Sequence, residues 1–158
     1  MMSCLIAIGA STALAACSSS GGPTSGEAGA HMSKDAMWLL DSMQKSLKAP
    51  ERYTVTDDGS TDRKCGSGKQ KRTFAAHMKV PASPNAHNAL VLDSGDASGL
   101  LGARGYKLDT GAGQVRKSDN KYVEAMTNEK AHTHITVTLM AHGAPTLDYV
   151  LMGTTDCL

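Results

Sequence analysis

The sequence predicts an α+β domain, a two-layer sandwich in which an antiparallel sheet of about four to five strands carries two helices on one face. The first observation is an early segment whose apolar residues recur at the spacing of one helix face. The second is a set of segments in which apolar and polar residues alternate, which is typical of half-buried strands. The third is their order: an early helix, two strands, a second helix and an antiparallel meander.

The first predicted helix covers about residues 34–48, with Ser33 as a candidate N-cap and Pro50 as the residue that ends it. Its apolar face contains Ala36, Leu39, Leu40, Met43 and Leu47. Strands are expected at 53–56, 73–80, 122–126, 132–141 and 146–153. Residues 60–70 are expected to form a loop around Cys65. Residues 85–105 should form the second helix, with Gly105 as its C-cap glycine.

Length and charge fit one ordinary domain. The chain has 158 residues, and residues 34–158 are expected to form a single globular α+β domain. A net charge of +1 gives no electrostatic case for nucleic-acid binding, which favours strongly basic domains. Basic residues do gather locally, at Arg63, Lys64, Lys69, Lys71 and Arg72. Two interpretations are open: a solvated loop beside a cysteine, or a contact with anionic lipid or cell-wall polymer.

The N-terminal segment indicates export and lipid attachment. Residues 5–16, LIAIGASTALAA, are too short for a transmembrane helix, which needs about 20 apolar residues, but suit the core of an export signal. They end in Leu14-Ala15-Ala16-Cys17, the bacterial lipobox pattern, in which the Cys thiol is the nucleophile that takes up a diacylglyceryl group. We expect residues 1–16 to be a cleaved signal peptide and residues 17–33 a lipidated N-terminus and flexible linker. The alternatives are a chance cysteine after an ordinary secretory signal, or a buried cysteine in a core helix.

The number of cysteines also indicates an exported protein. Cys4 would leave with the signal, and Cys17 would carry lipid. Cys65 and Cys157 then remain as an even pair in an oxidising environment, where a disulfide is the default. A metal site is the weaker alternative, because two thiols so far apart lack zinc-type spacing.

His132-Thr133-His134 is the cluster with a candidate chemistry. Residues two apart on a strand point to the same side, so His132 and His134 should share the open, polar face of the sheet. His77 is expected on the solvent side of another strand. Three imidazoles on one face could bind Zn²⁺ or Cu²⁺. We favour the alternative, a polar face that happens to use histidine, and expect no cofactor.

Catalytic motifs do not stand out, and we expect the chain not to be an enzyme. No Gly-x-Ser-x-Gly sequence occurs. Asp57-Asp58 suits a turn, and the pair Asp93 and Asp96 suits turns or caps better than paired acids for hydrolysis.

Several short motifs occur together in this chain. They are Leu14-Ala15-Ala16-Cys17, the Ser/Gly linker, the helix ending in Pro50, TVTDDG at 54–59, Cys65-Gly66, ARGY at 103–106 and GTTDC at 153–157. In these features the chain resembles a group of small, uncharacterised actinobacterial lipoproteins. The resemblance implies a membrane-anchored α+β domain with lipid on Cys17, a Cys65–Cys157 disulfide and no established activity.

These inferences together predict a protein anchored in the bilayer through acylated Cys17, on the extracytoplasmic face of the cell membrane. We expect it to act as a non-catalytic interaction or accessory module, with an envelope protein as its partner. The alternative is a small-ligand or metal-binding lipoprotein that uses the histidine-bearing sheet face.

Overall fold

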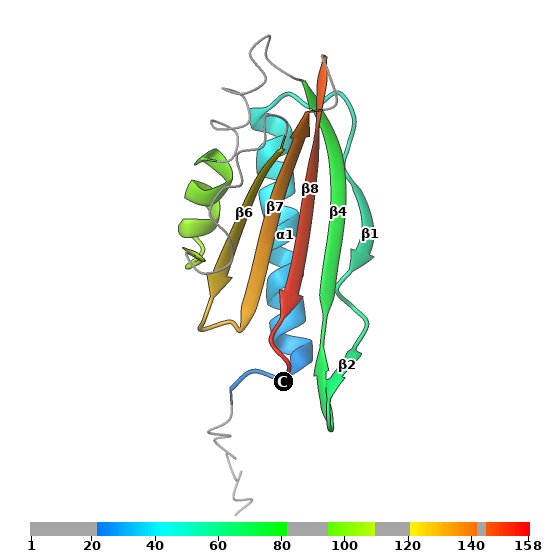
Figure 1. Cartoon of the computed structure of the whole chain (residues 1–158), viewed down its shortest axis with the longest axis vertical. Helices are drawn as coiled ribbons and strands as arrows, with labels where there is room; N and C mark the ends of the chain where they lie inside the picture. Colours follow the sequence, from blue (N-terminus) through cyan, green and yellow to red (C-terminus); the bar gives the residue numbers. More distant parts are fainter. Residues whose placement is uncertain (1–21, 82–94, 110–120, 142–144) are drawn as a thin grey trace, which may run out of the picture.

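A helix on an antiparallel sheet forms the core of the protein (Figure 1). The computed structural model describes residues 22–81, 95–109, 121–141 and 145–158, so the predicted signal peptide and Cys17 lie outside the described residues. The elements are α1 (Ser25–Ser46), β1 (Thr54–Asp58), β2 (Arg63–Gly66), β3 (Lys69–Lys71), β4 (Thr73–Pro81), β5 (Lys107–Leu108), β6 (Lys121–Asn128), β7 (Thr133–Ala141) and β8 (Thr146–Thr155). Of the second predicted helix, 85–105, residues 95–102 form a shorter helix and residues 103–105 form a turn, while residues 85–94 lie outside the described residues.

The main sheet has six strands in the order β1-β4-β8-β7-β6-β5, and β2 pairs with β3 in a separate hairpin. Every pairing is antiparallel. The α+β class and the antiparallel sheet are therefore confirmed. The predicted number of strands is too low, because β5 is very short and the hairpin carries charged residues in place of an apolar alternation.

The residues of β4 and β8 alternate between buried and more exposed positions throughout, and those of β7 do so as far as Met140. The buried set faces α1, which contacts these three strands. On the helix, the buried apolar residues are Ala28, Met32, Ala36, Leu39, Leu40 and Met43. Ala97 and Leu101 of the shorter helix belong to the same core. The predicted apolar face of the first helix is thus largely confirmed, and only Leu47 lies beyond its end.

The start of α1 differs from the prediction. A capping box begins the helix: the Thr24 hydroxyl accepts a hydrogen bond from the Glu27 backbone N–H, and the Glu27 carboxylate accepts one from the Thr24 backbone N–H. Residues 25–33 are helical as a result, so the predictions of a flexible linker up to residue 33 and of a domain that begins at residue 34 are wrong. Ser33 is not the N-cap; its hydroxyl donates to the Asp58 carbonyl oxygen at 2.7 Å.

The disulfide between Cys65 and Cys157 is present, with 5.8 Å between the two Cα atoms. Cys65 belongs to residues 60–70, which are predicted to form a loop; this segment instead contains most of the β2–β3 hairpin. Gly105 has φ +86, which suits its predicted place after the second helix. Among the described residues, no helix is long and apolar enough to cross a membrane.

Helix α1 lies close to the sheet at Gly153 of β8. A Cβ atom at this position would lie 2.8 Å from Met32 Sδ and 3.4 Å from Phe74 Cβ, and both of those residues are buried. A larger side chain at this position would therefore force the buried Met32 side chain to move.

We expect Gly153→Ala to lower the free energy of unfolding by about 1–3 kcal/mol, the usual cost of overpacking a dense core. Gly99→Ala is the matched control, because its added Cβ would meet nothing within 4 Å on an exposed part of the shorter helix. That variant should be neutral or up to about 1 kcal/mol more stable, by helix propensity. Denaturant unfolding measures both, and equal effects would contradict the close approach.

Candidate functional site

The three predicted histidines do not form one site. His77 of β4 and His134 of β7 are separated by β8, on which they pair with Val150 and Thr154 respectively. This register places them two strand spacings apart, about 10 Å, and four residues apart along the strands, about 13 Å, so roughly 16 Å in all. The prediction that His77 lies close enough to be a third metal ligand is wrong. The alternation of side chains along a strand predicts which face of the sheet His77 occupies, but not which strands lie beside it.

His132 and His134 meet at a carboxylate that the sequence analysis did not single out. Asp156 Oδ2 lies 2.9 Å from His132 Nδ1, and Asp156 Oδ1 lies 2.6 Å from His134 Nε2. His132 precedes β7 in a turn with φ +54, so it is not the strand residue that was predicted. The Asp156 backbone N–H also donates to the His132 carbonyl oxygen at 2.9 Å. The cluster therefore ties the β6–β7 turn to the segment that follows β8.

The electrostatics of this cluster suit a structural tie. The hydrogen bond from His134, followed by the one from His132, holds the pKa of the Asp156 carboxyl below its ordinary value. His134 Nδ1 is engaged as well, 3.0 Å from the Thr127 hydroxyl. Within the described residues, no group of three or more His, Cys, Asp or Glu side chains is arranged to hold a metal ion.

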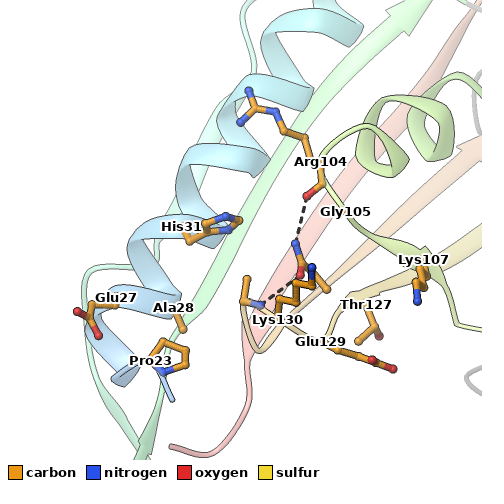
Figure 2. Close-up of a pocket in the computed structure, with 12 residues that line it drawn as sticks. Pro23, Glu27, Ala28, His31, Arg104, Gly105, Lys107, Thr127, Glu129 and Lys130 are labelled. Atoms are coloured by element: carbon orange, nitrogen blue, oxygen red, sulfur yellow. Dashed lines mark hydrogen bonds between the residues drawn. The ribbon is translucent and has the colours of Figure 1, made fainter. Parts of the chain in front are cut away.

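A pocket of about 680 Å³ lies between the N-terminal half of α1, the Arg104–Lys107 segment and the β6–β7 turn. Figure 2 shows His31 and Ala28 on its α1 side and Lys130 on the turn opposite. Its lining also includes Pro23, Gly105 and Ala131, which are small or apolar, and the oppositely charged Lys107 and Glu129. This mixed lining does not select for one charge of ligand.

Beside this pocket, the buried residue Asp35 holds the Arg104 segment against α1. Asp35 is 1% exposed, and its Oδ1 atom lies 2.9 Å from Arg104 Nη1. His31 Nδ1 lies 3.1 Å from Asp35 Oδ2, close enough for an ion-pair contact but without hydrogen-bond geometry. The Arg104 guanidinium also stacks over the Trp38 ring, 4.2 Å from its centroid. In Figure 2 the Arg104 side chain extends toward α1, where its positive charge is paired with the Asp35 carboxylate.

Tyr106, two residues further along, is buried against the same network. Burial raises the pKa of Tyr106 to about 12, and its phenol oxygen accepts a hydrogen bond of 3.0 Å from the Thr133 hydroxyl. A phenol with so high a pKa stays protonated at neutral pH. Tyr106 therefore serves the packing of this segment on β7.

The sheet face opposite α1 carries mostly small side chains. Across its centre lie Ala75 and His77 of β4, Val150, Met152 and Thr154 of β8, His134, Thr136 and Thr138 of β7, and Val123 and Ala125 of β6. We call this set the open face. Met152 is 59% exposed and pairs in register with Ala75 and Thr136. At one end of the open face, the next row of paired residues across the four strands has three charged members, Lys79, Asp148 and Lys121, together with Met140.

We expect Asp156→Asn to lower the free energy of unfolding at neutral pH by about 1 kcal/mol, since its two hydrogen bonds to histidine weaken. The folded state binds fewer protons at Asp156 than the unfolded state, because its pKa is lowered on folding. The stabilisation is thus present above about pH 4 and is lost as the pH falls through the folded pKa. Unfolding curves across this range should show wild type and variant converging in acid.

Asp41→Asn provides the control, because Asp41 makes only a 3.9 Å contact with exposed Arg52. It should change the free energy of unfolding by less than about 0.5 kcal/mol at every pH. An Asp156→Asn variant as stable as this control at neutral pH would contradict the proposed tie.

Comparison with known proteins adds nothing to these observations. No protein-family model, curated protein or solved structure matches the chain.

Proposed function

We propose that this chain is an extracytoplasmic lipoprotein, anchored to the cell membrane by acylated Cys17, whose domain acts as a non-catalytic interaction module for an envelope protein. The open face is the observation that carries the proposal. In this account both helices cover one face of the sheet in a two-layer sandwich, and the other face meets the partner.

The open face has the composition of a protein-binding surface. Its centre contains His77 and His134 but no Asp, Glu, Lys or Arg residue, and Met152 is 59% exposed there. Depletion of charge at the centre and enrichment in methionine are typical of protein interfaces. Strand pairing also fixes the backbone that carries these side chains, which reduces the backbone entropy lost on binding.

We do not retain the alternative in which the histidines on the sheet face bind a metal ion. His77 is too far from His134, and Asp156 already engages both other histidines. The pocket beside His31 shares Thr127 with the His134 contact, but His132 and His134 are not among its lining residues, and its lining of mixed charge favours no ligand class.

The anchor can be tested by mass spectrometry of the membrane fraction. We expect the mature protein to begin with Cys17 carrying a diacylglyceryl group, and Cys17→Ala to abolish this modification and release the protein from membranes. Cys4→Ala is the control and should leave modification and fractionation unchanged, because residue 4 precedes the expected cleavage site. An unmodified Cys17 in membrane-bound protein would overturn the anchor.

The open face can be tested by photo-crosslinking in intact membranes. A photoreactive residue in place of Met152 should give one discrete adduct with an envelope protein, and Met152→Lys should abolish binding of that protein. The same group at Met37 is the control, because Met37 is 43% exposed but lies on α1. Equal labelling from both positions, or no adduct from residue 152, would count against the open face.

A further inference from the structure

The β2–β3 hairpin concentrates positive charge. Its segment Arg63–Lys71, with the sequence RKCGSGKQK, has four basic residues and no acidic one. Arg63 and Lys71 pair directly across the hairpin. Like charges opposite one another destabilise a strand pair, so this charge is not explained by the stability of the hairpin.

The hairpin contributes almost nothing to the core but is firmly attached to the domain. The residues of β2 and β3 are exposed except Cys65 and Lys71, which are intermediate. A two-stranded hairpin is marginally stable by itself. Here the Cys65–Cys157 disulfide holds it, and Gln70 and Leu158 exchange two backbone hydrogen bonds of 2.8 and 2.9 Å. The fold thus fixes the position of a charged element that it does not need for its core.

Nearby acidic side chains are already engaged within the domain. Asp57 binds Arg63 and Thr73, Asp62 binds Arg72 and Ser25, and Asp156 binds two histidines. Arg63 and Arg72 are therefore neutralised locally. Among the described residues, no acidic side chain forms an ion pair with Lys64, Lys69 or Lys71. These three lysines, which we call the hairpin lysines, keep a charge that no carboxylate among the described residues pairs with. Lys64 and Lys69 are exposed and Lys71 is partly buried, and Lys69 Nζ lies 3.4 Å from the Cys157 carbonyl oxygen.

The hairpin lies at the end of the domain where the anchor would be attached. The Ser25 hydroxyl at the start of α1 donates to Asp62, just before β2, at 3.1 Å. Figure 1 shows β2, the start of α1 and the C-terminus at the same end of the molecule. Residues 18–24 separate Cys17 from α1 and can span at most about 25 Å when fully extended. An acylated Cys17 would therefore keep this end close to the lipid headgroups.

We infer that the hairpin lysines bind anionic lipid headgroups and form a second membrane contact beside the acylated Cys17. The inference rests on the proposed anchor, which supplies the proximity, and on the charge that the fold leaves unpaired. Each lysine near an anionic surface strengthens binding about fivefold. Together with the lipid, the contact would orient the domain with this end toward the bilayer.

The contact can be tested without the lipid. A chain that begins at Ser18 keeps every buried core residue, since the first of them is Ala28, and it retains both cysteines of the disulfide. This chain should bind vesicles of phosphatidylcholine and phosphatidylglycerol at low salt but not vesicles of phosphatidylcholine alone. Replacing Lys64, Lys69 and Lys71 by Gln should reduce binding about a hundredfold.

The matched control replaces Lys34, Lys45 and Lys48 by Gln, which removes the same charge from exposed positions along and just beyond α1. This control should bind nearly as well as the parent chain. Equal loss in both triple variants, or no preference for the anionic vesicles, would overturn the inference. Because the test uses no acylated protein, it fails independently of the Cys17 modification, which mass spectrometry reports.

Discussion

The packing of α1 on β8 and its neighbours is the contact on which the rest of the structure depends. It buries the methionine and leucine face of the helix, and Gly153 lets the helix axis approach the sheet at the level of Met32. Because α1 occupies one face of the sheet, the alternation along β4, β7 and β8 leaves the other set of side chains exposed or partly exposed. The same packing brings the start of α1 beside the hairpin. The exposure of the open face and the position of the hairpin lysines beside the start of α1 therefore both follow from the placement of this helix.

The end of the domain near the start of α1 holds many of the specific polar and covalent ties. The disulfide, the Asp156–histidine cluster and the Asp62–Arg72 pair all lie there, and each joins segments that are distant in the sequence. None of them is part of the apolar core. The disulfide and the Asp156–histidine cluster therefore link the hairpin and the β6–β7 turn to the C-terminal segment.

Sequence patterns predicted the class, the antiparallel sheet and the disulfide because each depends on local periodicity or on simple counting. The start of α1 was missed because the Thr24–Glu27 capping box is hidden in a Ser/Gly-rich run that resembles a linker. The hairpin was missed because charged residues replace the apolar alternation of a strand. The prediction that His77 lies near His132 and His134 was wrong for a different reason. The alternation along a strand predicts which face of the sheet a residue occupies, whereas the order of the strands decides which residues are neighbours. Asp156 follows the two histidines at a distance that no local pattern connects.

The most direct test of the account is the orientation of the acylated protein on a bilayer. A fluorophore carried by a non-natural amino acid would be placed at Ser67, at the hairpin tip, or at Lys48, just beyond the far end of α1. Since α1 has 22 residues and is about 33 Å long, the two positions should differ clearly in height above the membrane. With a quencher on the lipid headgroups, the account predicts strong quenching at Ser67 and little at Lys48. Equal quenching at both positions, or stronger quenching at Lys48, would contradict it.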